Sequence, residues 1–376
     1  MSETWRFAVF LIVVLSIWAA LHAYVVWRVG AVPWVAEHLS RRTLIAVAAV
    51  LWLSYPLARV LERRGIDALG TPLEIVGATW MGVLFLLFFA LLAADILAIP
   101  FAIWKPEAAP SLRLAAAALA LALGAVGIVQ FLRGPAVVEH EVALPGLPAE
   151  RDGTVLVAVS DLHVGSMLGP RWLRSRVRQV EALRPDAIAV VGDLVDGSAD
   201  HMAEALPVLR ELRAPLGVWA VTGNHEFYAG LERSVKLLED AGYTVLRDRS
   251  VEVVPGLVFA GVDDLTARRQ FGRREDPLAT ALGGRPDGAT VLLSHTPWLA
   301  EDAAEAGAGL MLSGHTHDGQ IWPFNFVVKL QYPYIAGRYD VGTMTLVVCR
   351  GTGVWGPPLR LWRRSEILKI TLRAGG

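Results

Sequence analysis

Four long apolar stretches in the first third of the chain limit its fold more than any other feature. They run from Trp5 to Trp27, Thr43 to Leu57, Ile75 to Phe101 and Leu112 to Leu132. A helix needs about 20 apolar residues to cross the hydrocarbon core of a bilayer, and the first, third and fourth stretches meet this length. The second is shorter, so it is expected either to span or to lie at the interface. Since backbone polar groups in lipid must be satisfied within the segment, the sequence predicts about four transmembrane helices.

The remainder of the chain has the composition of a soluble domain. Hydrophobic residues make up 54% of the 376 residues, and most of the excess lies before Arg133, whereas residues 134–376 are rich in charged residues and glycine. The sequence therefore predicts a membrane domain over residues 1–133 and a soluble domain over residues 134–376, with residues 134–153 passing from a linker into an edge strand. The single cysteine, Cys349, excludes an intrachain disulfide and a cysteine-based zinc site. The net charge of −1 gives no indication of nucleic acid binding.

The apolar stretches leave the membrane orientation open. Four crossings would put the N-terminus and the soluble domain on the same side, and the lysines and arginines near the stretches divide almost evenly between the two sides. Asp95 is the one acid deep in an apolar stretch. It is either a functional residue or a residue at headgroup level, since Pro100 follows closely.

The soluble domain repeats one construction, in which a short apolar strand ends at a polar residue able to bind a metal. Helical stretches are expected between these strands, at Pro170–Leu183, Met202–Leu212, Gly230–Ala241 and Trp298–Ala306. This alternation predicts an α/β domain, and the carboxyl ends of its strands should bring the polar residues to one rim. The strands and residues are Thr154–Ser160 before Asp161 and His163, Ala187–Val191 before Asp193, Gly217–Val221 before Asn224 and His225, Thr290–Leu293 before His295, and Leu310–Leu312 before His315 and His317.

The residue types at this rim indicate a metal centre. Carboxylate, amide and imidazole donors without thiolates suit Mn, Fe or Zn. The candidates are too numerous for one ion, whereas they fit a site with two ions about 3.5–4 Å apart, which can clamp a displacement at phosphorus. We therefore expect two divalent or trivalent metal ions, whose identity the sequence does not fix.

The order and spacing of the motifs resemble those of the calcineurin-like metallophosphoesterases. The shared motifs are Asp-x-His, Gly-Asp-x-x-Asp, Gly-Asn-His-Glu, a lone histidine after a strand, and Gly-His-x-His, over about residues 137–372. The resemblance implies two stacked mixed sheets flanked by helices. It also implies that Asp193 bridges the two metals and that His225 contacts the scissile phosphate and assists the leaving group. Asp196 is expected to stabilise its loop or to support the ligands from behind, and not to bind metal itself. The implied ligands are Asp161, His163, Asp193 and His317 for one metal and Asp193, Asn224, His295 and His315 for the other.

Residues 313–320 are similar to a membrane-linked bacterial subgroup of this family, marked by Ser-Gly-His-Thr-His-x-Gly-Gln. Asp318 stands where that subgroup usually has glycine, and it is expected either to orient His317 or to repel anionic substrates. Some members of the subgroup cleave the pyrophosphate of a nucleotide-linked acylated sugar such as UDP-2,3-diacylglucosamine, and others act on generic phosphodiesters. The resemblance implies a location in a bacterial inner or plasma membrane. Because nucleotide-linked substrates are cytoplasmic, it favours a cytoplasmic catalytic domain.

An aromatic-rich segment, residues 321–339, follows the last motif. Its aromatic side chains are expected either to enter the bilayer interface and admit a lipid or to pack on the sheet.

The sequence thus predicts a membrane-anchored hydrolase of phosphodiester or pyrophosphate bonds, with a phosphoester, lipid or otherwise, as its substrate. The alternatives are a phosphomonoesterase and a non-catalytic membrane sensory or binding module. The sequence does not indicate the oligomeric state.

Overall fold

The computed structural model describes residues 3–101, 108–197, 202 and 204–375. By their contacts, the residues divide into two units, which we call the helical unit and the α/β unit. The helical unit comprises Met1–Leu132 and Gly356–Leu361, and the α/β unit comprises Arg133–Trp355 and Trp362–Gly376.

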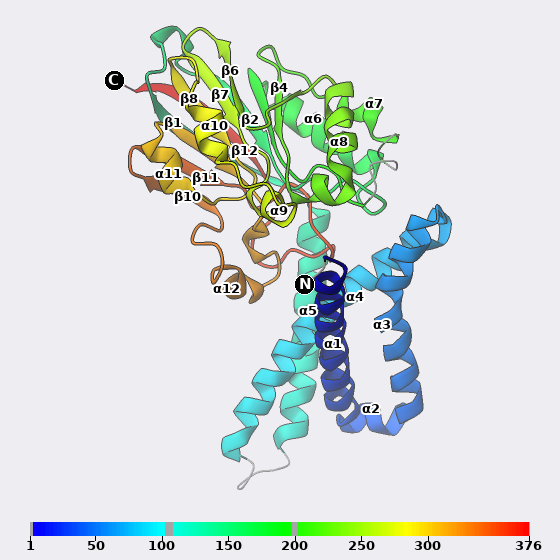
Figure 1. Ribbon diagram of the computed structural model, residues 1–376. Coiled ribbons are helices and arrows are strands. Elements are labelled where there is room, and N and C mark those ends of the chain that lie inside the picture. Colours follow the sequence, from blue (N-terminus) through cyan, green and yellow to red (C-terminus); the bar gives the residue numbers. More distant parts are fainter. Residues whose placement is uncertain (1–2, 102–107, 198–201, 203, 376) are drawn as a thin grey trace. The chain divides into compact units, whose positions relative to one another are not determined.

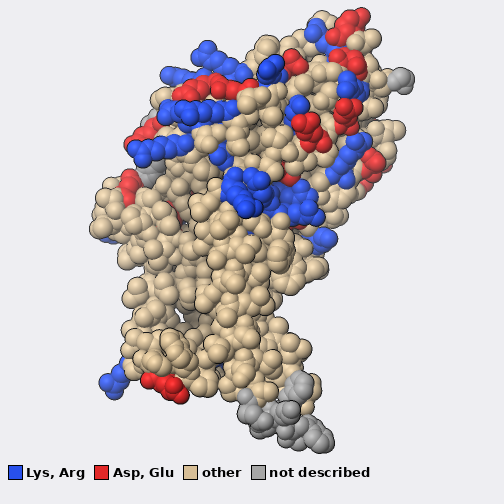
Figure 2. Space-filling view, turned by 180° about the vertical axis from the view of Figure 1, so that it is seen from behind, with Lys and Arg blue, Asp and Glu red and all other residues tan. Residues whose placement is uncertain are grey.

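The described part of the helical unit contains four helices that are long and apolar enough to cross a membrane, over Ile12–Gly30, Arg41–Arg63, Asp67–Ala98 and Ala108–Leu132. Figure 2 shows that the described part of this unit carries few charged side chains on the face in view, whereas the α/β unit carries both signs. The elements are α1 (Glu3–Gly30), α2 (Pro33–His38), α3 (Arg41–Arg63), α4 (Asp67–Ala98), the 3-10 turn η1 (Ile99–Phe101) and α5 (Ala108–Leu132), as drawn in Figure 1.

Helix α3 is longer than its apolar stretch suggested, and at 23 residues it is long enough to span. It continues past Pro56 to Arg63. Charged residues in its last turns are paired, since the Arg59 Nη1 atom lies 2.9 Å from Glu62 and 3.1 Å from Glu74. Of the two arrangements expected for the second stretch, the length of α3 fits a span.

Asp95 of α4 sits in a cluster of polar side chains. Its carboxylate lies 2.6 Å from Arg28 Nε and 2.9 Å from Arg113 Nε, and it accepts a hydrogen bond of 2.7 Å from the Tyr24 hydroxyl. A charge placed within an apolar helix is costly unless it is paired. These partners compensate Asp95, and they join α1, α4 and α5.

Residues 356–361 pack within the helical unit. The backbone N–H of Arg360 donates to the carbonyl of Gly127 in α5 at 3.0 Å. A side chain at Gly127 would meet Leu359, so the glycine permits this close approach.

The α/β unit consists of two stacked mixed sheets, as expected, with helices on both outer faces (Figure 1). One sheet has the order β1-β12-β2-β3-β4-β5, with β1 at its edge as predicted, and the other has the order β10-β11-β9-β8-β7-β6. The strands are β1 (Ala136–Pro145), β2 (Val155–Val159), β3 (Ala187–Val191), β4 (Val218–Val221), β5 (Thr244–Val245), β6 (Arg249–Val254), β7 (Leu257–Gly261), β8 (Ala289–Leu293), β9 (Leu310–Ser313), β10 (Gly337–Val341), β11 (Met344–Val348) and β12 (Glu366–Gly375).

Three apolar layers hold the α/β unit together. The inner layer lies between the sheets and includes Leu156 and Ile370 from one sheet and Phe259 and Leu293 from the other. Outer layers pack the first sheet against α6, α7 and α8 and the second against α9, α10 and α11. The helices are α6 (Pro170–Ala182), α7 (Leu206–Leu209), α8 (Asn224–Asp240), α9 (Leu265–Gln270), α10 (Pro277–Leu282), α11 (Ala300–Glu305) and α12 (Phe324–Val328), with short 3-10 turns η2 (Ala149–Arg151) and η4 (His317–Gly319).

Two helices differ from their predicted ranges. Of the helix expected over Met202–Leu212, in which residue 203 lies outside the described residues, the structure has the single α-helical turn α7, with Pro207 in its first turn. Helix α8 begins at Asn224 and bends at Gly230, whose φ is 108°. The start at Asn224 matters because it places this residue and His225 in the first helical turn.

Candidate metal centre

The polar residues predicted to bind metal all follow the ends of inner strands. The loops after β2, β3 and β4 come from one sheet, and those after β8 and β9 come from the other. Backbone hydrogen bonds join neighbouring loops, since Asp161 N–H donates to Gly192 at 3.1 Å and His163 N–H donates to Asp193 at 3.0 Å. The two sheets are also joined here, since the backbone N–H of His315, after β9, donates to Asp161 Oδ1, after β2, at 3.1 Å. Side chains distant in sequence therefore meet at one shared rim.

Five of these residues have a left-handed backbone. Residues other than glycine rarely adopt positive φ values, and such strained conformations concentrate at functional sites. The fold therefore maintains an unfavourable backbone at the rim, which aims the side chains inward. The φ values are 53° for Asp161, 46° for His163, 50° for Asp193, 71° for His315 and 51° for His317.

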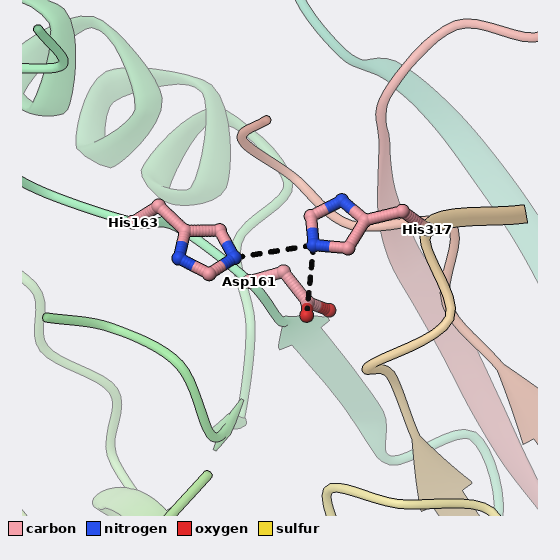
Figure 3. Close-up of side chains that lie close together, drawn as sticks. All are labelled: Asp161, His163 and His317. Atoms are coloured by element: carbon pink, nitrogen blue, oxygen red, sulfur yellow. Dashed lines mark hydrogen bonds and ion pairs between the residues drawn. The ribbon is translucent and has the colours of Figure 1, made fainter. Parts of the chain in front are cut away.

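Asp161, His163 and His317 form the first cluster of donor atoms (Figure 3). The two Nε2 atoms of His163 and His317 face each other at 3.1 Å, and His317 Nε2 lies 3.3 Å from Asp161 Oδ1. All three residues are buried. Two nitrogens bound to one ion at 2.0–2.1 Å are about 2.9–3.4 Å apart, so the spacing fits a shared cation.

Asp193, His295 and His315 form the second cluster. His295 Nε2 lies 3.2 Å from Asp193 Oδ2 and 3.3 Å from His315 Nδ1. The same Asp193 oxygen lies 3.8 Å from His163 Nε2. Asp193 Oδ2 therefore lies near a histidine of each cluster.

Asn224 has a buried side-chain oxygen, Oδ1, with no hydrogen-bond partner among the described residues. A buried polar atom without a partner is costly unless a ligand satisfies it. An amide oxygen at a rim of carboxylates and imidazoles fits a hard or borderline cation, so its isolation agrees with a metal-binding role.

His225 belongs to a third cluster, in which its donor atom lies within 4.8 Å of those of His163 and Asp193. Its Nδ1 atom lies 3.2 Å from Asp196 Oδ1, and its backbone N–H donates to Asp193 Oδ1 at 2.9 Å. Geometry alone allows His225 to bind a metal or to offer its other ring nitrogen to a substrate.

Comparison with known proteins identifies the family. The family description "Calcineurin-like phosphoesterase" matches residues 154–319. A protein from Danio rerio and one from Bos taurus, each named "Transmembrane protein with metallophosphoesterase domain", are 35% and 36% identical over 263 and 267 residues, or 67% of this chain and 60% of each relative. An uncharacterised metallophosphoesterase from Aquifex aeolicus is 32% identical over 264 residues, covering 69% of this chain and 99% of the relative. The chain belongs to the calcineurin-like metallophosphoesterases.

Residues 154–319 match a family of phosphoesterases whose relatives are named metallophosphoesterases. Among the described residues, four helices long and apolar enough to cross a membrane indicate a membrane protein, in agreement with the names of the vertebrate relatives. The chain spans about 60% of the length of the vertebrate relatives. Vertebrate and bacterial relatives match at similar identity, so the bacterial subgroup stays a prediction. The family favours an enzyme over a sensory module.

Burial and charge set opposite protonation tendencies for the rim histidines. Burial lowers the pKa of His163 to about 3, and burial together with the charge of His295 lowers the pKa of His315 to about 4. Both rings are therefore neutral near pH 7, as metal ligation requires. Burial alone would lower the pKa of His295, but the charge of Asp193 holds it well above the ordinary value. A proton and a metal cation compete for Nε2 of His295, so the Asp193 carboxylate that raises the pKa of this ring also attracts a metal.

The carboxylates of the metallophosphoesterase remain ionised. Burial raises the pKa of Asp161, but the positive charge of His317 outweighs it and holds the pKa well below the ordinary value. Burial likewise raises the pKa of Asp193, whereas His295 and His225 lower it further than burial raises it. The rim therefore offers anionic oxygens for cations.

Outer contacts orient two of the histidines. His295 Nδ1 lies 2.8 Å from the Val191 carbonyl, so Nδ1–H donates and Nε2 keeps its lone pair for the second cluster. His315 is turned the other way, since its Nε2 lies 2.7 Å from the Tyr332 hydroxyl and its Nδ1 faces the cluster. Such partners fix the tautomer and orientation of a ligand histidine. Sequence reasoning placed Tyr332 in an aromatic segment but not beside His315.

Glu226 is a second residue whose role sequence reasoning missed. Its buried carboxylate accepts backbone N–H groups of Gly223 at 2.7 Å and of residues 193, 194 and 195 at 2.9, 2.8 and 3.0 Å. The carboxylate thus clamps the loop of Asp193 to the start of α8. Its position three residues after the N-cap, Gly223, is the capping-box spacing, which was the available signal.

Asp318 adopts a φ of 53°, a left-handed conformation that glycine adopts more readily than other residues. Its carboxylate accepts from Arg350 Nε at 3.1 Å, and Arg350 Nη1 also lies 2.6 Å from Glu366 Oε2. The added acid is thus compensated by an arginine, which links the η4 turn to β12.

The aromatic segment, residues 321–339, has an exposed part and a part that packs on the second sheet. Trp322, Phe324 and Phe326 are exposed. Tyr334 and Tyr339 instead pack against the core of the second sheet, with ring centroids 4.9 Å apart. Only the first part is available to a membrane or a substrate.

Proposed function

We propose that the protein hydrolyses phosphodiester or pyrophosphate bonds at a centre of two metal ions held by the rim. The observation that best supports this proposal is the pair of donor clusters, both of which have a histidine near Asp193. Asp161, His163, Asp193 and His317 hold one ion, and Asp193, Asn224, His295 and His315 hold the other. The ions are Mn, Fe or Zn, because the donors include no thiolate.

The bound ions supply positive charge that activates a water nucleophile and neutralises the phosphate. His225 then donates a proton to the departing oxygen or stabilises its charge. Its Nδ1–H is held by Asp196, which leaves Nε2 for the substrate. Burial lowers the pKa of His225, but Asp193 and Asp196 outweigh burial and raise it to about 9, so the ring carries the proton near pH 7.

The surrounding side chains keep this arrangement rigid. Glu226 fixes the backbone around Asp193, and Tyr332 and Val191 fix His315 and His295. Catalytic groups held before the substrate arrives need no reorganisation during the reaction.

The candidate spans of the helical unit favour a substrate that resides in a bilayer, either a lipid-linked phosphoester or a nucleotide-linked lipid such as UDP-2,3-diacylglucosamine. A phosphomonoesterase is the alternative within the same chemistry. The proposed location is the bacterial inner or plasma membrane, with the α/β unit in the cytoplasm.

Two variants test the assignment on the full chain in detergent, with bis-p-nitrophenyl phosphate and p-nitrophenyl phosphate as diester and monoester. Asp193→Ala should abolish turnover because it removes the residue shared by both clusters. His225→Ala should retain metal and lose most of the rate. An Asp193→Ala protein as fast as wild type would contradict the assignment. If wild type hydrolyses the monoester faster than the diester, the phosphomonoesterase is favoured.

A further inference from the structure

Residues 322–330, which we call the apolar loop, expose a continuous group of apolar side chains next to the metal-binding rim. Leu330 is 87% exposed and Phe326 58% exposed, and Trp322, Phe324 and Val327 are also exposed. None of the five residues of α12, at the centre of this loop, is buried. Soluble proteins rarely leave such a cluster in water unless it binds something.

The apolar loop is fixed at both ends to residues of the rim. Its first residue follows Ile321, which is buried, and the loop packs so closely on η4 that a side chain at Gly319 would meet the backbone of Asn325. Just after the loop, the Tyr332 hydroxyl lies 2.7 Å from His315 Nε2. The exposed group is therefore held in place by the elements that position His317 and His315.

We propose that the apolar loop docks on the bilayer that anchors the chain and that it admits the apolar part of a lipid phosphoester to the metal centre. The substrate class rests on the proposed function, whereas the docking itself does not.

The short connection between α5 and β1 favours a bilayer as the binding partner of the apolar loop. Helix α5 ends at Leu132 and β1 begins at Ala136, so only three residues lie between the last candidate span and the first strand. The α/β unit cannot move far from the membrane surface on so short a connection.

The composition of the loop also suits a bilayer. Residues 319–337 contain one charged residue, Lys329, and no acid. Tryptophan and phenylalanine with a cation are typical of segments that insert to headgroup depth, where the lysine can reach anionic lipid while its stem stays apolar.

The same placement defines the substrate. A phosphate ester of a membrane lipid can present its phosphorus to the rim while its acyl chains remain beside the loop. Hydrolysis then breaks the P–O bond to the leaving alcohol, forms a P–O bond to water and returns the proton to the leaving oxygen, with no further reactant.

Fluorescence quenching tests the docking independently of activity. Leu330→Cys in the full chain is labelled with an environment-sensitive dye, which should spare Cys349 because this cysteine is buried. The protein is placed in nanodiscs of phosphatidylethanolamine and phosphatidylglycerol that contain a bromine-labelled lipid. Lys236→Cys, whose native side chain is 72% exposed on α8, is the matched control.

The label at position 330 should emit at shorter wavelength than the label at 236 and should be quenched by the brominated lipid. Equal emission and no quenching at both positions would overturn the docking proposal. Shielding at 330 that depends on protein concentration and not on brominated lipid would show a second copy on the loop, and would also overturn it.

A double variant tests the substrate class. Phe326→Asp with Leu330→Asp should reduce hydrolysis of the p-nitrophenyl ester of phosphatidic acid in vesicles by about tenfold or more, because charged side chains oppose insertion. Hydrolysis of soluble bis-p-nitrophenyl phosphate should be unchanged. Equal loss on both substrates would contradict lipid delivery by the loop. If wild type hydrolyses neither ester, the proposed function fails while the quenching result still decides the docking.

Discussion

Replacing Glu226 by glutamine should weaken the α/β unit substantially although it changes only one atom of the side chain. Each carboxylate oxygen of Glu226 accepts two backbone N–H groups, Oε2 from Gly223 and Asp193 and Oε1 from Leu194 and Val195. An amide has one acceptor oxygen and an NH2 group. In either orientation of the amide, two of the four buried N–H groups would face another donor.

The geometry gives the size of the effect. A buried donor left without an acceptor costs about 1–3 kcal/mol, so two such donors should cost about 2–6 kcal/mol of unfolding free energy. The loop of Asp193 should also lose its fixed position, so metal binding should weaken in parallel.

Pulse proteolysis of the full chain across a urea series measures the stability of the α/β unit without isolating it. Glu232→Gln is the matched control, because the side chain of Glu232 is 77% exposed. The Glu226→Gln midpoint should fall well below those of wild type and of the control. A midpoint equal to that of Glu232→Gln would refute the role assigned to the four hydrogen bonds.

Two further substitutions test the groups behind the histidines. Asp196→Asn removes a partner that raises the pKa of His225. Because the protonated ring is lost as pH rises through this pKa, the fall of kcat at high pH should begin at a lower pH in the variant. An unchanged pH profile would exclude His225 as the proton donor. Tyr332→Phe removes the hydroxyl beside His315 and should weaken metal affinity by about 10–100-fold. Competition with a chelator measures this affinity, and an unchanged value would show that the contact is dispensable.

The strand-and-ligand pattern was sufficient to predict much of the candidate site. Asp161, His163, Asp193, His295, His315 and His317 each follow a strand end, and the fold brings their donor atoms into clusters. Strand ends are local features with a strong apolar pattern, so they can be read from the sequence. The presence of two sheets was implied by the family resemblance. The division of these strands between the two sheets was not predicted, because adjacency in a sheet is not encoded locally.

The contacts that orient the ligands were not predictable in this way. Glu226 and Tyr332 act through backbone groups or ring atoms brought together by the tertiary fold. Tyr332 carries no local pattern, and the capping-box spacing of Glu226 indicates a helix start but not its contact with the loop of Asp193. The extent of α3 beyond its apolar stretch was not predicted either. Its last turns carry Arg59, which pairs with Glu74 of a different helix at 3.1 Å.

The number of metal ions bound per chain tests the central claim most directly. Wild-type full-length protein, purified in detergent without chelators and reloaded with manganese, should contain two ions per chain by elemental mass spectrometry. Asp193→Ala should contain fewer than two, because it removes the residue between the clusters. A wild-type protein that saturates with one ion or none would contradict the account.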